Sequence, residues 1–506
     1  MDRTVEAVET ITEGEARFER VRRVAGLVLA PAVFALLLLL PLGGLKPEAH
    51  RLAAVMAAVV VLWITEAMPL PVTALMGAAA CVVMRVAPAK EVFAPFADPL
   101  MFLFIGSFIL ARAIFLHRLD RRLAFGVLSI KWVGARPSRI LFAFGAVTAF
   151  MSAWISNTAT TAMMFAIGMA ILAFLFEQQK ESGQQQVSRR YATALMLMTS
   201  FAASVGGLAT PIGTPPNVIG LGFIRQLTGV EFPFFKWAVI GVPVVVVLFL
   251  WLFVYLNWLS PAGVREVEGS REMLKHEKER LGAWTRGQKS TLAAFLATVA
   301  LWVVPGLIAL AAGDQSAIYK NVNAVMPEAV AAVVGAVLLF LLPGEEGARA
   351  ITWEEAVKID WGVVLLYGGG FALGVLSFQT GLAESVGRGL TGLLPVSGGL
   401  GLLFASVAVA VVVSEATSNT ASANMVVPVV IAIARAQGAD PLEPAIGATM
   451  GASLGFMLPV STPCNAIVYG SGYVPLARMI RYGIFLDIVG VFVIVALVRL
   501  LVPFLR

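Results

Sequence analysis

A series of apolar stretches, each long enough to cross a membrane as a helix, restricts the fold of this chain more than any other feature of its sequence. A spanning helix needs about 20 mostly apolar residues. Full spans are predicted near residues 24–45, 52–68, 70–87, 100–116, 192–224, 236–259, 291–312, 326–343, 361–378, 444–473 and 484–503. Only 13% of the 506 residues are charged, against about 25% in soluble domains, which excludes a soluble protein. The sequence therefore predicts an all-α polytopic membrane protein with eleven transmembrane helices.

Two further apolar blocks, residues 139–176 and 399–435, do not read as simple spans, because each carries a polar cluster at its middle. The first cluster contains Ser152, Ser156, Asn157 and Thr158. The second contains Ser414, Glu415, Thr417, Ser418, Asn419 and Thr420. Polar groups at bilayer depth are tolerated where they line a cavity within the protein. Both blocks are therefore predicted to be re-entrant hairpins with polar tips.

The basic residues predict how the chain is oriented in the membrane. With two hairpins that do not cross, the arginines before residue 24, the segment 118–139 and the polar loop 265–289 all lie on one side, which the positive-inside rule makes the cytoplasm. The N-terminus is then cytoplasmic and the C-terminus is outside. The expected location is a bacterial inner membrane. Because the basic residues of this chain of net charge +6 stand between apolar runs, they indicate orientation and not binding to nucleic acid.

The two halves of the chain repeat each other. Asp98 and Asp360 stand 262 positions apart, and so do Asn157 and Asn419, each within a Ser-Asn-Thr-Ala sequence. A Pro-x-x-Thr-Pro-x-Asn motif occurs at 211–217 and again at 459–465. The repeat pairs the span at 70–87 with the one at 326–343, and these run in opposite directions. The repeat is therefore inverted, as in secondary transporters that bind substrate at the repeat interface.

The polar tips and the proline motifs together predict a binding site. Proline inside a helix leaves carbonyl groups without partners, so helices should break at 211–217 and at 459–465. Asn, Ser and Thr are common N-cap residues, so each tip should begin the returning arm of its hairpin. Freed carbonyls suit a hard cation, and helix N-termini suit a carboxylate. No Lys or Arg lies in these four segments, so a bound dianion would need cations for neutralisation, which predicts cation coupling.

With these motifs the sequence resembles the divalent anion:sodium symporter family, carriers of di- and tricarboxylates and sulfate. The similarity covers nearly the whole chain after about residue 24. The family fingerprint near the C-terminal end is present as Ser453, Phe456, Pro459, Asn465, Ile467 and Val468; both Ser-Asn-Thr tips and the Thr-Glu-Ala of residues 65–67 also match. Two positions depart from the family pattern: Ser414 stands where Thr is frequent, and Cys464 replaces the second proline of the usual pair.

The resemblance implies a set of ligands, carried over motif by motif. One sodium site would use Ser152, Ser156 and Asn157 with the carbonyl of Gly213. The other would use Ser414, Thr417 and Asn419 with the carbonyl of Ser461. The substrate carboxylates would contact Asn157, Thr158, Thr214, Pro215, Asn419, Thr420, Thr462 and Pro463. Sodium would be the coupling ion, with no organic cofactor.

The resemblance also implies a homodimer in which a transport part slides against a fixed scaffold, as an elevator does. On this basis the chain divides into a cytoplasmic tail (1–23), scaffold helices (24–135), the first half of the transport domain (136–260), a cytoplasmic loop (261–290), further scaffold helices (291–395) and the second half of the transport domain (396–506).

The expected function is sodium-coupled symport of a divalent anion, with a C4-dicarboxylate (succinate, malate or fumarate) as the first choice. Citrate or sulfate transport, exchange without sodium, and an anion channel stay open at this stage. Glu415 could relay a cation or proton, or could brace its hairpin. An enzyme is not expected, although Gly451–Gly455 satisfies Gly-x-Ser-x-Gly, because all three histidines lie in polar connections.

Overall fold

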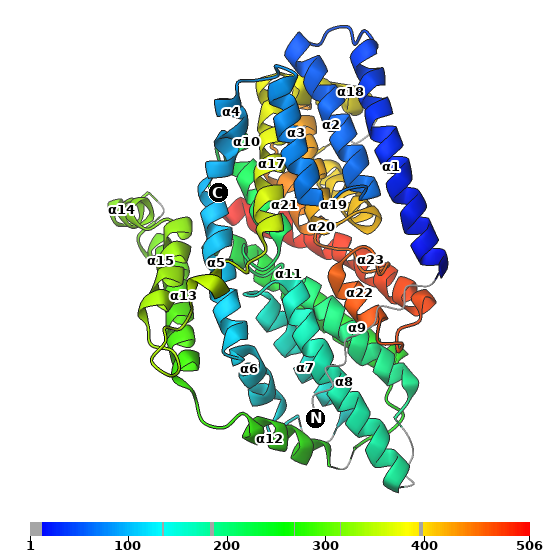
Figure 1. The fold of residues 1–506 in the computed structure, drawn as a ribbon, viewed down its shortest axis with the longest axis vertical. Helices are drawn as coiled ribbons and strands as arrows, with labels where there is room; N and C mark the ends of the chain where they lie inside the picture. The colour runs from blue at the N-terminus through cyan, green and yellow to red at the C-terminus, as the bar shows by residue number, and fades with distance from the viewer. Residues whose placement is uncertain are drawn as a thin grey trace.

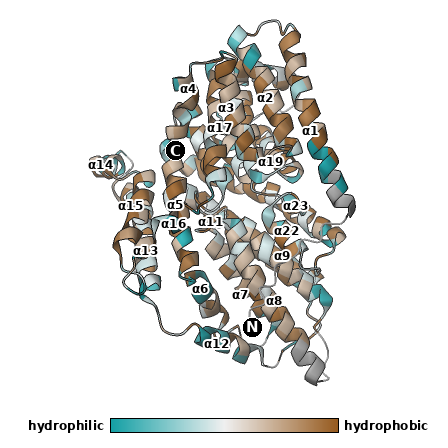
Figure 2. Ribbon diagram, viewed as in Figure 1, coloured by the Kyte–Doolittle hydropathy of each residue, from teal (hydrophilic) through white to brown (hydrophobic). Residues whose placement is uncertain are grey.

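The computed structural model describes residues 13–133, 136–182, 187–267, 269–313, 315–393 and 398–505. These residues form helices joined by short connections, and the single β-bridge among them joins Pro343 to Arg349. Figure 1 shows the elongated bundle, and Figure 2 shows apolar residues along most of the long helices. The predicted all-α membrane protein is confirmed.

The helices of the first half have the following bounds: α1 Glu13–Leu39, α2 Pro47–Thr65, α3 Leu70–Val83, α4 Ala89–Phe93, η1 Ala94–Ala97, α5 Pro99–Leu116, α6 Leu119–Leu128, α7 Pro137–Ser152, α8 Asn157–Ser182, α9 Arg189–Gly206, α10 Pro215–Thr228, α11 Phe234–Leu259 and α12 Ser270–Arg280. Those of the second half are α13 Arg286–Ala312, α14 Ala317–Val325, α15 Glu328–Leu341, α16 Trp353–Ala356, α17 Trp361–Gln379, α18 Leu382–Leu393, α19 Gly399–Ala416, α20 Asn419–Ala436, α21 Leu442–Gly451, α22 Pro463–Tyr469, α23 Leu476–Leu501 and η2 Val502–Leu505.

Ten helices in the described part of the chain are long and apolar enough to cross a membrane, and the pair α14 and α15, bent by 50°, makes an eleventh if it is counted as one span. Three of the ten, α8, α19 and α20, are arms of the predicted hairpins, so the ten are not the same set as the eleven predicted spans. The predicted span at 70–87 is shorter than expected. It forms α3, with 14 residues, because Pro69 precedes its first turn and a left-handed Arg85 follows its end. The predicted spans at 192–224 and 444–473 are each interrupted, as the proline motifs predicted.

The two predicted hairpins are present as pairs of helices with short polar turns. In the first, α7 ends at Ser152 and α8 begins at Asn157; in the second, α19 ends at Ala416 and α20 begins at Asn419. The Ser418 hydroxyl caps α20 by accepting a hydrogen bond from the Ala421 N–H at 3.2 Å. Each tip therefore begins the returning arm of its hairpin, as predicted.

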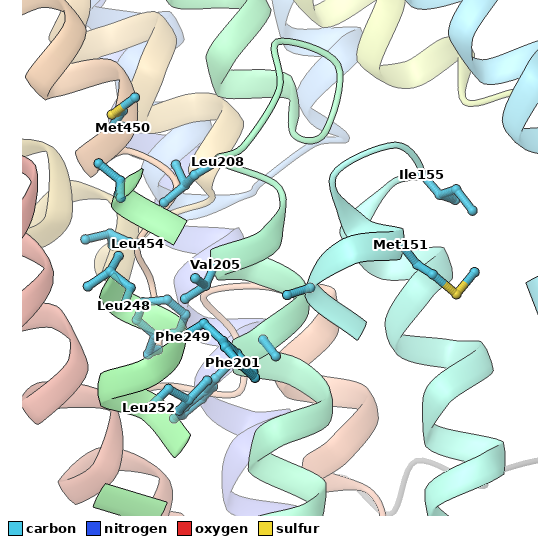
Figure 3. Close-up of a cluster of buried hydrophobic side chains, with 14 of the residues drawn as sticks. Met151, Ile155, Phe201, Val205, Leu208, Leu248, Phe249, Leu252, Met450 and Leu454 are labelled. Carbon is cyan, nitrogen blue, oxygen red and sulfur yellow. The ribbon is translucent and has the colours of Figure 1, made fainter. Parts of the chain in front are cut away.

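Packing of the helices follows the inverted repeat. The helix α5 packs against α15 of the other half, and the equivalent helix α17 packs against α3. The breaks are exchanged in the same way, because α22 packs on α8 and α9 while α10 packs on α20 and α21. Side chains of both halves meet around the breaks, where Phe201, Val205 and Leu208 lie near Leu248 and near Leu454 in one apolar cluster (Figure 3). Neither half completes its own core.

Candidate functional site

The first tip and the first break meet at Asn157. With its amide oriented so that donors face acceptors, the side-chain nitrogen of Asn157 donates to Ser152 Oγ at 2.7 Å, to the Gly213 carbonyl at 3.1 Å and to the Ala203 carbonyl at 3.2 Å. Three oxygen atoms, one each from the tip, from α9 and from the break, therefore surround the end of one amide group. If the amide turns over, it presents a fourth oxygen to the same position, and a set of oxygens suits a hard cation.

The second tip also joins a serine and an asparagine, at Ser414 and Asn419. Ser414 Oγ lies 2.8 Å from two acceptors for its single proton, Asn419 Oδ1 and the Ala452 carbonyl, while Asn419 Nδ2 donates to the Ser453 carbonyl at 3.2 Å. A Cβ on Gly455 would lie 3.1 Å from Asn419 Oδ1, which shows how closely the tip approaches the break. In both halves the Ser and the Asn of the tip, five residues apart, are hydrogen-bonded to each other, but their backbone partners differ.

The remaining residues predicted to bind sodium lie close to the tips but face different partners. The Ser156 hydroxyl accepts from the Ala159 N–H at 3.4 Å, so it caps α8. Thr417 Oγ1 donates to the Val413 carbonyl at 2.7 Å, and its hydroxyl proton is therefore directed back along α19. Ser461 Oγ donates to Glu415 Oε2 at 2.6 Å, and the Glu415 carbonyl lies 3.2 Å from the same hydroxyl.

The residues predicted to bind substrate stand at the starts of helices that pack between the two halves, α22 on α8 and α10 on α20. Thr214 and Pro215 stand at the start of α10, and Thr462 and Pro463 stand at the start of α22. The thiol of Cys464 lies within reach of the hydroxyls of Thr158, Thr161 and Ser204, so the start of α22 adjoins the start of α8. In the other half, Thr420 lies at the first turn of α20, which packs on α10.

Two asparagines outside the predicted ligand sets, Asn217 and Asn465, form hydrogen bonds to the free carbonyls of the breaks. Asn217 Nδ2 donates to the carbonyls of Gly207 at 2.9 Å and Thr210 at 2.8 Å. Asn465 Nδ2 does the same with Gly455 at 2.9 Å and Leu458 at 3.0 Å. The final Asn of each Pro-x-x-Thr-Pro-x-Asn motif was the signal for this role, because an amide donor can satisfy carbonyls that the helix leaves free.

The surroundings of Asn465 are not symmetric with those of Asn217. Ser200 Oγ donates to Asn465 Oδ1 at 2.6 Å, which joins the first half to the second. Asn217 Oδ1 is buried without a hydrogen-bond partner, and Ala448 stands where the repeat would place a second serine.

The comparisons with known proteins agree with this architecture. A family model described as the sodium:sulfate symporter transmembrane region matches residues 21–505. The chain is 33% identical over 97% of its length to the sodium-dependent dicarboxylate transporter SdcS of Staphylococcus saprophyticus, of which it covers 93%. It is 31% identical over 94% of its length to SdcS of Staphylococcus aureus strain USA300, of which it covers 91%.

Among solved structures, the YdaH transporter of Alcanivorax borkumensis has a similar fold, with a TM-score of 0.52 over 96% of this chain and 98% of that one at 12% identity. The family match spans both hairpins and both breaks, and the family consists of transporters and not of enzymes. This protein is therefore a membrane transporter that belongs to the sodium:sulfate symporter family.

Proposed function

We propose that the protein is a sodium-coupled symporter of a C4-dicarboxylate such as succinate, malate or fumarate. The observation that carries the proposal is the convergence of Ser152 Oγ and the carbonyls of Ala203 and Gly213 on the amide of Asn157. In the second half, Asn419 likewise lies between a tip serine, Ser414, and a backbone carbonyl next to the break, that of Ser453. The names of the staphylococcal relatives, which are 31–33% identical over almost the whole chain, support the same substrate and ion.

In the proposed mechanism, sodium ions bind first at the two tips. Ser152, Ser156, Asn157 and the Gly213 carbonyl form one site; Ser414, Thr417, Asn419 and the Ser461 carbonyl form the other. The bound cations and the N-terminal ends of α8, α10, α20 and α22 then neutralise the dianion, because no Lys or Arg lies in the tip or break segments. Binding of the anion therefore depends on prior binding of the cations.

We further propose that the transport part, residues 136–260 and 396–506, moves as a body against the scaffold formed by residues 24–135 and 291–395. The protein would work as a homodimer in a bacterial inner membrane, with its N-terminus in the cytoplasm and its C-terminus outside.

Purified protein in liposomes, supplied with labelled succinate, tests the coupling. We expect an inward sodium gradient to drive uptake at least tenfold faster than an equal choline gradient. Uptake that is equal in sodium and choline would show that succinate transport is not coupled to sodium and would favour an exchanger. Competition by unlabelled citrate and sulfate would rank these anions against the dicarboxylates.

Replacement of the two tip asparagines tests the site. We expect Asn157→Ala and Asn419→Ala each to lower uptake at least twentyfold, with the protein still eluting as a single folded species in detergent. Thr380→Ala, a threonine at the end of α17 outside the tips and breaks, is the matched control and should transport normally. Full uptake by both asparagine variants would contradict the assignment of Asn157 and Asn419 to the sodium and substrate sites.

A further inference from the structure

Two buried carboxylates lie against the second break, and neither is among the ligands assigned above to sodium or to the substrate. Glu415 is the last residue but one of α19, with 5% of its surface exposed, and Asp487 lies in the middle of α23, with 4% exposed. Glu415 Oε1 accepts from the Met457 N–H at 2.7 Å, and Glu415 Oε2 accepts from Ser461 Oγ at 2.6 Å. Glu415 is therefore anchored to the break by both of its oxygens.

The packing of α23 aims Asp487 at this carboxylate. A Cβ on Gly483 would overlap the backbone of Phe456, and one on Gly490 would lie 2.6 Å from the side chain of Leu454, so these glycines bring α23 close to the break on the face that carries Asp487. The carboxylate of Asp487 lies within reach of Glu415 and near the Phe456 N–H. Neither oxygen of Asp487 receives a hydrogen bond of acceptable geometry.

The described positive side chains do not balance the pair. Within the part of the chain that the structure describes, no ion pair joins Lys or Arg to Glu415 or to Asp487. The nearby tyrosines are engaged elsewhere, because Tyr255 Oη donates to the Tyr482 carbonyl at 3.1 Å and the Tyr482 hydroxyl pairs with Ser260 Oγ at 2.8 Å. Adjacent carboxylates at membrane depth are very costly unless something neutralises them.

The first half shows that the break does not need these carboxylates. Gly241 approaches the backbone of Leu208 and Ala209, and Gly483 approaches that of Phe456 and Met457. The two glycines are therefore equivalent in the repeat, and they align α11 of the first half with α23 of the second. In that alignment Val245 of the first half occupies the position equivalent to Asp487. The position of Glu415 corresponds to Ala153 through the 262-residue repeat of the tips. The same fold is therefore built in the first half with two apolar side chains.

From these observations we propose that the carboxylates of Glu415 and Asp487 bind a sodium ion in addition to the two ions proposed at Asn157 and Asn419. The available ligands are all oxygen atoms, which is the donor set of a hard monovalent cation. A shared proton would occupy one oxygen of Asp487 and leave the other without a partner, whereas a cation can coordinate both. The proposal rests on the sodium-dependent transport proposed above, but its test measures binding and not transport.

The test is a sodium titration of thermal unfolding for the purified full-length protein in detergent at pH 7.5, with choline chloride keeping the ionic strength constant. A variant with Asn157→Ala and Asn419→Ala disables the tips, and we expect it to retain a sodium-dependent rise in unfolding temperature. Adding Asp487→Asn to that variant should abolish the rise. In the otherwise unchanged protein, Asp487→Asn should raise the sodium concentration for half-maximal stabilisation at least fivefold.

Two controls separate the site from general damage. Asp120→Asn, at another buried aspartate on α6, should leave the sodium titration unchanged. The double variant Glu415→Ala with Asp487→Val installs the residues of the first half; it should fold and should lose the same sodium response as Asp487→Asn.

Three results bear on the proposal in other ways. An unchanged sodium titration in Asp487→Asn would overturn it. A variant whose sodium titration is unchanged but whose stability no longer varies between pH 5 and pH 8 would overturn it in favour of a bound proton. Sodium-independent succinate uptake by the unchanged protein would overturn the proposed symport alone, because the unfolding titration would still report the cation site.

Discussion

Asn217 and Asn465 each donate hydrogen bonds to two carbonyls of their own break, but Asn465 forms one hydrogen bond more. Each amide nitrogen satisfies two carbonyls of its break, and Asn465 also accepts the Ser200 hydroxyl. A buried polar group left without a partner costs about 1–3 kcal/mol. At the scale of single residues, the two breaks are therefore not equally sensitive to loss of the asparagine.

We expect Asn465→Ala to lower the free energy of unfolding by about 3–5 kcal/mol, because it leaves two carbonyls and the Ser200 hydroxyl without partners. Asn217→Ala should cost about 1 kcal/mol less, since only two carbonyls lose a donor and an orphaned Oδ1 is removed. Thermal unfolding of both purified variants in detergent measures the difference. Equal losses, or a larger loss in Asn217→Ala, would contradict the asymmetry.

A second prediction at this scale concerns pH. Asp120 lies in the first turn of α6, outside the membrane spans, and burial raises its pKa from the ordinary 3.8 to about 6. The folded protein therefore holds this proton more tightly than the unfolded chain does, and stability falls as the pH rises from about 4 to about 6. The full penalty, up to about 3 kcal/mol, applies above that range.

Asp120→Asn should remove this penalty. We expect the variant to unfold at a higher temperature than the unchanged protein at pH 7.5 and at nearly the same temperature at pH 4. Unfolding curves at four pH values between 4 and 7.5 would test this. A parallel pH dependence in the two proteins would mean that Asp120 does not carry the effect.

At the scale of elements, the helices around the breaks depend on backbone contact. Gly206 approaches the backbone of Ala149, and Gly483 approaches that of Phe456, so both hairpin and broken-helix packing leave no room for a side chain. Backbone atoms cannot move aside as a flexible side chain can. These positions therefore set how closely α9 and α23 reach the tips and breaks.

Gly483→Ala should destabilise the protein by about 2–3 kcal/mol and lower transport strongly, because its Cβ would overlap the Phe456 carbonyl. Gly389→Ala on α18 is the matched control, since a Cβ there meets nothing within 4 Å. The control should be neutral or should gain up to about 1 kcal/mol from helix propensity. Unfolding temperature and succinate uptake would be measured for both. Equal behaviour of the two variants would contradict the close packing.

The breaks and the tips could be predicted from the sequence, whereas the length of α3 and one contact between distant segments could not. The breaks after Gly206 and Gly451 could be predicted because proline removes a helical donor, and the tips because Ser and Asn cap helices. The short α3 was missed because the apolar run continues past the point where Arg85 takes a left-handed conformation. The contact between Asp487 and Glu415 was also missed, because it joins segments 72 positions apart and depends on the close approach that Gly483 permits.

At the scale of the whole molecule, the proposed scaffold and transport parts touch at several places. Asp98 at the start of α5 pairs with Arg225 of α10 and accepts a hydrogen bond from Tyr367 Oη at 3.1 Å. Gly370 of α17 packs directly on Asn424 of α20. If one part slides past the other, each of these contacts must break in every transport cycle.

A reversible cross-link tests this movement. In a protein with Cys81→Ala and Cys464→Ser, we expect Gly370→Cys with Asn424→Cys to form a disulfide under mild oxidation. Succinate uptake should then fall at least tenfold, and a reducing agent should restore it. Each single-cysteine variant, oxidised in parallel, is the control. A fully cross-linked protein that still transports would rule out sliding between α17 and α20.

The exchange of partners between the halves, with α22 on α8 and α9 and α10 on α20 and α21, also bears on how the protein is made. A ribosome finishes the first half while the helices that will cover its tip and break have yet to be synthesised. During that interval the polar turn of the first hairpin lies in the bilayer without the second-half helices that later cover it. Folding of the first half is therefore completed only after the second half has been synthesised. A truncated first half should be degraded by membrane proteases.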